Sequence, residues 1–195
     1  MVVAGVRRAR QHTHQLPAED RLAAIRRLLH DDTLDLRDRV GGLLVLVFAQ
    51  PLSRILTLTT DHVAFSGRQV AIRLGSEPLE LPEPLAQLVA TLARERPARA
   101  TTAVARDTRW LFPGMRLDAP LSEEHYRQRL KKIGVTALPA RTAAIASLAA
   151  SMPPAILADL LGISEASAAD WSALAGGDWA RYAAHASRRY QVAPV

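Results

Sequence analysis

The sequence predicts an α+β fold that is mainly helical and carries one small three-stranded antiparallel sheet. Apolar residues recur at helical spacing toward both ends of the chain. In between, the period shortens to two residues and is broken by glycine and proline, as in short strands. With 195 residues, 49% hydrophobic and 23% charged, the composition is that of an ordinary soluble globular protein.

Two helical segments are expected first, within a single domain over residues 16–195 that follows a basic flexible arm over residues 1–15. Pro17 with the carboxylates after it begins the first helix, whose apolar stripe is Leu22, Ile25, Leu28 and Leu29. Residues 35–48 form a second, deeply buried helix, because its last six residues are apolar on every face. Pro51 is expected to end it.

The remaining elements follow the change of period. After a short helix at residues 52–58, an antiparallel meander of three strands is expected at residues 62–65, 69–74 and 79–81. Helical patterning then returns at residues 84–94 and 123–133, and from residue 142 to the end.

The net charge of +6 favours a polyanionic partner such as double-stranded DNA. All basic residues except Lys131 and Lys132 are arginine, which a GC-rich genome would explain equally well. The positive surplus lies between residues 94 and 132, and it forms either a solvated face or a phosphate-contacting surface. The basic side chains of that surface would be Arg106, Arg109, Arg127, Arg129, Lys131 and Lys132.

The sequence does not contain the residues that several other functions require. The absence of cysteine excludes disulfides, thiolate metal sites and cysteine nucleophiles. No glycine-rich phosphate loop, serine-centred nucleophile motif or metal-binding His/Glu pair occurs, and His30, His62, His125 and His185 are scattered. We therefore expect no cofactor and no metal. The longest apolar run, residues 41–49, is too short to span a membrane, so a cytoplasmic protein is expected.

Residues 48–58, Phe-Ala-Gln-Pro-Leu-Ser-Arg-Ile-Leu-Thr-Leu, resemble the first motif of the tyrosine recombinase (phage integrase) catalytic domain. The resemblance extends over most of residues 16–171 and implies that fold and a DNA partner. The family's first arginine falls on Pro51, and Arg54 stands where the family usually has glutamate. The turn at residues 75–78, where the family carries a proton-donating lysine, has no lysine and contains Glu77.

The second family motif matches best at Leu138-Pro139-Ala140-Arg141. This register keeps Arg141 and replaces the first histidine by Leu138, whereas a register one residue away would lose the arginine too. The Leu-Leu-Gly of residues 160–162 is present, but Ile163 replaces the second histidine. Ser172 occupies the place of the nucleophilic tyrosine.

The resemblance therefore implies a fold without its chemistry, and no catalytic residue is assigned. Strand cleavage needs an ionisable nucleophile, cations that stabilise the phosphorane charge and an acid for the leaving oxygen. Losing one charge-stabilising donor alone costs about 10²- to 10³-fold in rate. Tyr182 and Tyr190 near the C-terminus are the tyrosines that could replace the nucleophile, with Tyr182 the nearer of the two to the expected position. Packing against Trp179 is the other interpretation of Tyr182.

Residues 155–175 also resemble a helix-turn-helix, with Gly162 at the turn and Ser164 capping the next helix. Its second helix offers glutamate, aspartate, serine and alanine, which read base edges poorly. A helical hairpin packed for stability explains the same pattern.

The sequence thus predicts a DNA-binding, integrase-like protein without strand-cleavage activity. Its phosphate contacts would be Arg141, Arg54 and the basic side chains between residues 106 and 132. Two alternatives remain open. One is a protein-interaction module derived from a recombinase domain that assembles with another recombinase subunit; the other is an active site-specific tyrosine recombinase.

Overall fold

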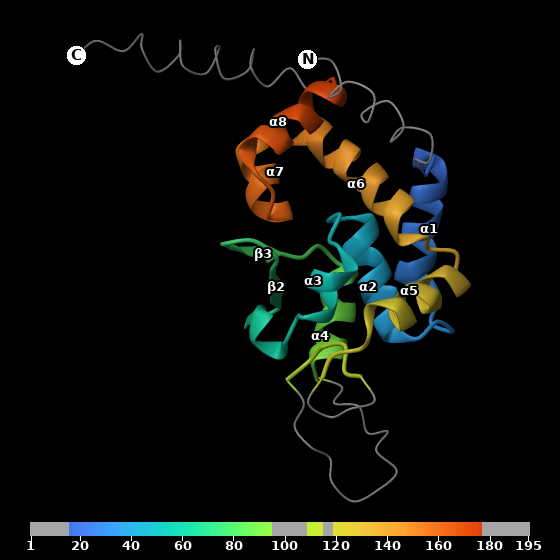
Figure 1. Cartoon of the computed structure of the whole chain (residues 1–195). Helices are drawn as coiled ribbons and strands as arrows, with labels where there is room; N and C mark the ends of the chain where they lie inside the picture. Colours follow the sequence, from blue (N-terminus) through green and yellow to red (C-terminus); the bar gives the residue numbers. More distant parts are fainter. Residues whose placement is uncertain (1–15, 95–108, 115–118, 177–195) are drawn as a thin grey trace, which may run out of the picture. The chain divides into compact units, whose positions relative to one another are not determined.

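The computed structural model describes residues 16–94, 109–114 and 119–176 (Figure 1). The chain divides into two compact units, residues 1–144 and residues 145–195, and each is described by itself. The arm expected over residues 1–15 lies outside the described residues, and the single domain over residues 16–195 stays a prediction.

Unit 1 contains most of the elements, and the predicted α+β fold with a small three-stranded sheet is confirmed. In chain order they are α1 (Ala18–His30), α2 (Leu36–Leu46), α3 (Leu52–Leu56), the 3₁₀ turn η2 (Thr60–His62), β1 (Val63–Ser66), β2 (Gln69–Arg73), β3 (Pro78–Glu80), α4 (Leu85–Arg94) and α5 (Glu123–Lys132). Helix α6 (Ala137–Ser151) runs across the division between the units, and unit 2 continues with α7 (Pro154–Leu161) and α8 (Glu165–Leu174).

Helix α2 is the central element of unit 1. Every residue from Asp38 to Leu46 is buried, as expected for a helix that is apolar on all faces. Helices α1, α3, α4 and α5 all contact it, and Figure 1 shows them arranged around it. The prediction of a deeply buried second helix is confirmed.

The end of α2 differs from the expectation, because Pro51 does not end it. The helix stops at Leu46, and the chain then turns through Ala49, which has a left-handed φ of 53°. The Gln50 amide donates back to the Leu44 carbonyl at 3.1 Å, which closes the turn. Pro51 instead caps the beginning of α3, where its extended backbone and missing N–H are tolerated.

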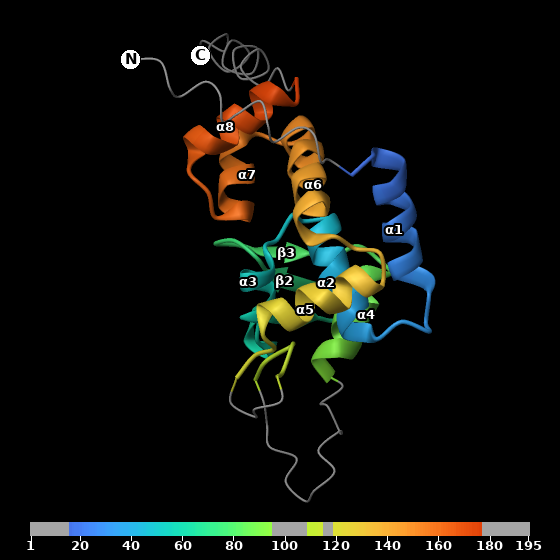
Figure 2. The same ribbon diagram turned by 45° about the vertical axis from the view of Figure 1, so that its right-hand side comes forward.

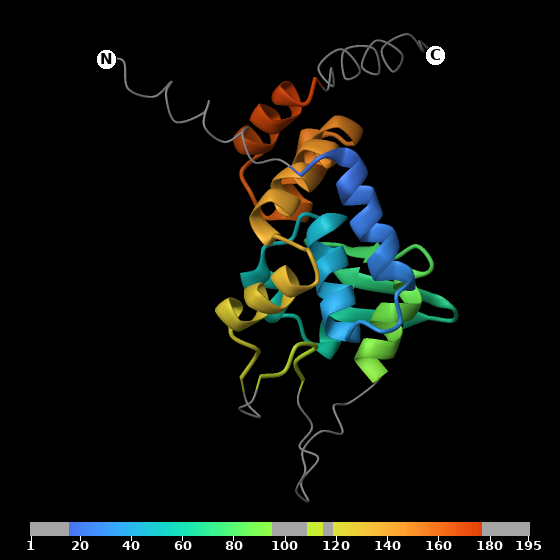
Figure 3. The ribbon, with the colours of Figure 1, turned by 90° about the vertical axis from the view of Figure 1, so that its right-hand side faces the viewer.

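The sheet is an antiparallel meander in the order β1-β2-β3. Val63 lies opposite Ile72, Phe65 opposite Val70, and Leu79 opposite Ile72, so these side chains share one face. Helix α4 contacts β1, β2 and α2, so it links the sheet to the buried helix (Figure 3).

A close approach between α2 and α5 requires glycine at position 41. The ring of Tyr126 on α5 is fully buried, and its hydroxyl donates to the Arg37 carbonyl at 2.6 Å. A Cβ at Gly41 would lie 1.8 Å from that hydroxyl oxygen. Glycine usually weakens a helix, so its presence inside α2 is explained by this contact.

Among the described residues, no single helix is long and apolar enough to cross a membrane; only the bent pair α5 and α6 passes that test when taken together.

We predict that Gly41→Ala destabilises the protein by about 3 kcal/mol, because the new methyl group overpacks against Tyr126. Helix propensity alone would make the alanine variant more stable by about 1 kcal/mol. A loss of stability would therefore show that the contact with Tyr126 outweighs helix propensity. Gly42→Ala is the matched control, since its nearest neighbour is the flexible end of Leu28, which can move. Urea denaturation measures the free energy of unfolding of both variants. A Gly41→Ala variant as stable as the parent would contradict the close approach of Tyr126 to Gly41.

Candidate nucleic-acid interface

Arg141 on α6 is held by the turn that follows α2. Its Nε donates to the Ala49 carbonyl at 2.8 Å, and the side chain is half-buried. Burial lowers the pKa of Arg141 from its ordinary value. No hydrogen bond involves its two terminal nitrogens within the part of the chain that the structure describes. The guanidinium is therefore fixed along one edge, while its opposite edge retains its donors.

One carbonyl at the end of α2 and one in the turn that follows it accept hydrogen bonds from arginines. Besides Arg141, Arg21 of α1 donates from Nη1 to the Leu46 carbonyl at 2.9 Å. Positive charge at this end complements the negative end of the helix dipole and satisfies carbonyls that the helix leaves without a partner. Arg141 thus has a structural role, whether or not it also binds phosphate.

The resemblance places the family's first arginine at Pro51, which is the N-cap residue of α3. Proline has no side-chain hydrogen-bond donor, so this position supplies no cation. Arg54 lies one turn later on α3 and is partly exposed. No ion pair of Arg54 occurs within residues 16–94, 109–114 and 119–176.

The turn between β2 and β3 is exposed at Ser76 and Glu77. It lies between Arg73 and Pro78, which are paired across β2 and β3. The only ionisable side chain in this turn is the Glu77 carboxylate, which would repel a phosphate. The nearest histidine before the sheet, His62, instead caps η2, where its Nδ1 accepts from the Thr59 amide at 3.2 Å.

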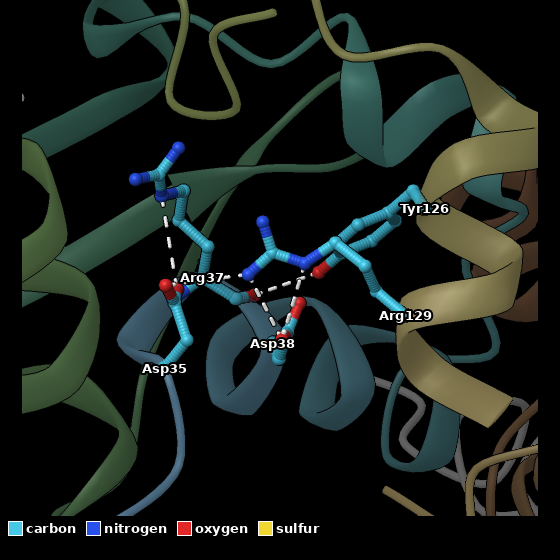
Figure 4. A network of polar contacts seen from close by, with 5 residues as sticks. All are labelled: Asp35, Arg37, Asp38, Tyr126 and Arg129. Atoms are coloured by element: carbon cyan, nitrogen blue, oxygen red, sulfur yellow. Dashed lines mark hydrogen bonds and ion pairs between the residues drawn. The ribbon is translucent and has the colours of Figure 1, made fainter. Parts of the chain in front are cut away.

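Two of the predicted phosphate contacts are engaged by carboxylates. Arg127 forms ion pairs with Glu123 and Glu124 one turn earlier on α5. Arg129 pairs with Asp38 at 2.9 Å and with Asp35 at 3.3 Å (Figure 4). Burial lowers the pKa of Arg129, but the hydrogen bonds and charges of Asp38 and Asp35 together outweigh it and raise the pKa overall.

Figure 4 shows how this network joins α2 to α5. The Arg129 guanidinium reaches Oδ2 of Asp38, while the Tyr126 hydroxyl reaches the Arg37 carbonyl. Oδ1 of Asp38 is buried and accepts no hydrogen bond. The sequence held a signal for Arg127, because Glu123 and Glu124 precede it at helical spacing. It held none for Arg129, whose partners are far away in the chain.

The other predicted contacts are exposed. Lys131 and Lys132 lie in the last turn of α5, and neither forms an ion pair among the described residues. The Arg109 guanidinium lies 5.0 Å from the centre of the Trp110 ring. Arg106 lies outside the described residues, as does Tyr182.

Unit 2 contains a helix pair at the predicted turn, which Figure 2 shows as α7 and α8. Gly162 has a φ of 63°, and the Ser164 hydroxyl accepts from the Ser167 amide. Ile163 is half-buried. Ser172, at the place expected for the nucleophile, is 3% exposed, and its Oγ is buried without a hydrogen bond. The helix-turn-helix resemblance of residues 155–175 stays a prediction.

Comparison with known proteins identifies the fold. No family model and no curated protein sequence matches the chain. The crystal structure of XerA recombinase matches with a TM-score of 0.58 and 15% identity, covering 81% of this chain and 57% of that one. A lambda integrase dimer bound to a COC′ core site gives a TM-score of 0.46 at 14% identity, covering 81% of this chain and 47% of that one, which is too low to support an argument.

The chain therefore has a fold like that of the tyrosine recombinase catalytic domain, as its motifs implied. It spans little more than half the length of XerA recombinase. At this level of identity the likeness concerns the fold alone.

We predict that Arg129→Met destabilises the protein by about 2 to 3 kcal/mol, because Asp38 would remain buried without its cation. Arg127→Met removes the same charge from an exposed position on the same helix and is expected to cost less than about 1 kcal/mol. Thermal and urea unfolding compare the two variants. Equal losses in both would show that the Asp38 pair has no special role in stability.

Proposed function

We propose that this chain binds duplex DNA through backbone phosphates and does not cleave it. The recombinase-like fold and the net charge of +6 support a DNA partner. The observation that carries the proposal is the geometry of Arg141. Its Nε is fixed on the Ala49 carbonyl, so the edge formed by its terminal nitrogens is preorganised to donate two parallel hydrogen bonds to one phosphate.

The other contacts follow from which cations have no carboxylate partner in the described structure. Arg54, Arg109, Lys131 and Lys132 meet this condition, and Arg106 remains a candidate from the sequence. Arg127 and Arg129 are weaker candidates than the sequence indicated, since acidic neighbours already balance their charge. Contacts of this kind set the position of DNA and carry little sequence information.

The absence of cleavage is inferred from what the mechanism requires. Pro51 removes one phosphate-stabilising guanidinium, and Glu77 puts a negative charge where the fold's relatives place a proton donor. Ser172 is buried, and an aliphatic hydroxyl needs an adjacent base to act as a nucleophile. With these groups missing, phosphate binding is the function that Arg141 can still perform.

One observation favours the alternative of a protein-interaction module. Leu138, at the start of α6 and one turn before Arg141, has 74% of its surface exposed. In unit 2, Ile156 and Leu174 are each 58% exposed. Large exposed apolar side chains suit a protein partner such as another recombinase subunit better than they suit phosphates. Either function is compatible with the cytoplasmic location expected from the sequence.

We predict a gel shift with duplex DNA at low salt, with an affinity that falls steeply as salt rises. Arg141→Lys is expected to weaken binding by about tenfold, because lysine cannot donate bidentately to a phosphate. Arg21→Lys is the matched control at the same end of α2 and should leave affinity unchanged. The absence of any shift at low salt would exclude DNA binding and favour the interaction module.

We also predict that a nicked suicide DNA substrate yields no covalent protein–DNA adduct. Denaturing gels after incubation provide the measurement, with an active recombinase on its own site as the positive control. An adduct that mass spectrometry maps to Tyr182 would show that this tyrosine replaces the missing nucleophile, and the third possibility, an active recombinase, would then be correct.

A further inference from the structure

Phe65, Arg68 and Arg94 form a second basic surface in unit 1, which we call the hairpin-tip patch. Phe65 lies near the end of β1 with 46% of its surface exposed. Arg68 stands in the two-residue turn between β1 and β2, directly after Gly67. Arg94 is the last residue of α4, and its guanidinium carbon lies 5.0 Å from the centre of the Phe65 ring.

Strand alternation explains why an aromatic ring is exposed here. Phe65 shares a sheet face with Val63, Val70 and Ile72, all of which are buried. That face is the one bearing the apolar residues, and α4 packs against both strands. Phe65 is the last residue of this row toward the turn, and the side chain over its ring belongs to Arg94 at the end of α4. The Phe65 ring therefore lies under the Arg94 guanidinium and outside the buried core.

The position of Arg94 over the Phe65 ring prepares it to bind. A guanidinium held over an aromatic ring is attracted by the ring's quadrupole and loses part of its rotamer freedom before any ligand arrives. Its N–H donors project in the plane of the group, and its flat face remains suited to stacking on another planar group. The chain turns sharply at Gly67, with a φ of 59°, which places Arg68 at the tip of the hairpin.

The arginines of the hairpin-tip patch differ from those of α5 in their ion pairs. Neither Arg68 nor Arg94 forms an ion pair with a carboxylate within the described residues, whereas Arg127 and Arg129 do. An exposed aromatic ring flanked by two arginines that have no ion pair in the described part of the chain differs from an ordinary solvated face, in which opposite charges alternate. The combination of positive charge and flat stacking surfaces is what single-stranded nucleic-acid sites use.

We propose that the hairpin-tip patch binds single-stranded nucleic acid, with a base stacked on the Phe65–Arg94 pair and a neighbouring phosphate on Arg68. Bases inside a duplex are already stacked on each other, so a planar protein surface at a hairpin tip gains stacking only from an unpaired base. This site goes beyond the duplex contacts proposed above and does not depend on them, because it uses none of the same residues.

The test measures binding of the full chain to a fluorescently labelled oligothymidylate of about 15 nucleotides by anisotropy, a length that covers one binding site. Phe65→Leu removes the ring and keeps an apolar side chain, and Arg94→Gln removes the planar cation. Each is expected to weaken binding at least about tenfold, the usual effect of losing one stacked base. Arg127→Gln is the matched control, because it removes one charge that acidic neighbours already balance, and it should stay within about twofold of the parent.

Two comparisons decide the outcome. Circular dichroism of each variant establishes that it is folded, and a blunt duplex establishes that any loss is confined to single strands. The proposal is supported if Phe65→Leu and Arg94→Gln lose oligothymidylate binding and keep duplex binding, and this result stands even if Arg141→Lys has no effect on duplex DNA. It is overturned if the folded Phe65→Leu variant binds oligothymidylate as the parent does, or if Arg127→Gln loses as much as Arg94→Gln, which would indicate a response to net charge only.

Discussion

The packing of α5 against the buried helix α2 is the constraint on which the rest of unit 1 depends. Gly41 has no side chain, so the Tyr126 ring can lie directly against the helix, and the tyrosine hydroxyl then reaches the Arg37 carbonyl. The ring also packs on Phe112, with the ring centres 5.5 Å apart. Full burial raises the pKa of Tyr126 well above its ordinary value, because the phenolate would have to be desolvated. A single absent methyl group therefore fixes how closely two helices approach.

Many of the arginines in this chain stabilise backbone structure. Arg39 is buried, and it donates to the Leu28 carbonyl at 2.8 Å and the Leu29 carbonyl at 2.6 Å near the end of α1. Arg21 and Arg141 act similarly at the end of α2. A guanidinium suits this work because its several donors can satisfy carbonyls that a helix end leaves without partners. A count of basic residues thus overstates the charge that is available to DNA.

A fold and a catalytic site differ in how many specific residues they require. The fold of this chain is similar to that of XerA recombinase although only 15% of the residues are identical. A fold is maintained by many apolar contacts that tolerate substitution, whereas phosphoryl-transfer chemistry depends on a few specific groups in fixed positions. Pro51 begins α3 and Ile163 follows α7, and both helices form with these residues in place.

The sequence alone determined the elements of the fold, because apolar periodicity reports directly which faces are buried. The strand pairing, the burial of α2 and the turn at Gly162 all follow from such local patterns. It also determined which reactive groups are absent, since a missing side chain needs no structure to be noticed.

The tertiary structure was needed to assign partners to the charged residues that pair across the fold. The partners of Arg129 and Arg141 lie about ninety residues away, so no local pattern could assign one to Asp38 and the other to the Ala49 carbonyl. The stack of Arg94 on Phe65 likewise arises where a helix end meets a strand. Electrostatic and hydrogen-bond partners depend on distances across the fold, which periodicity does not contain.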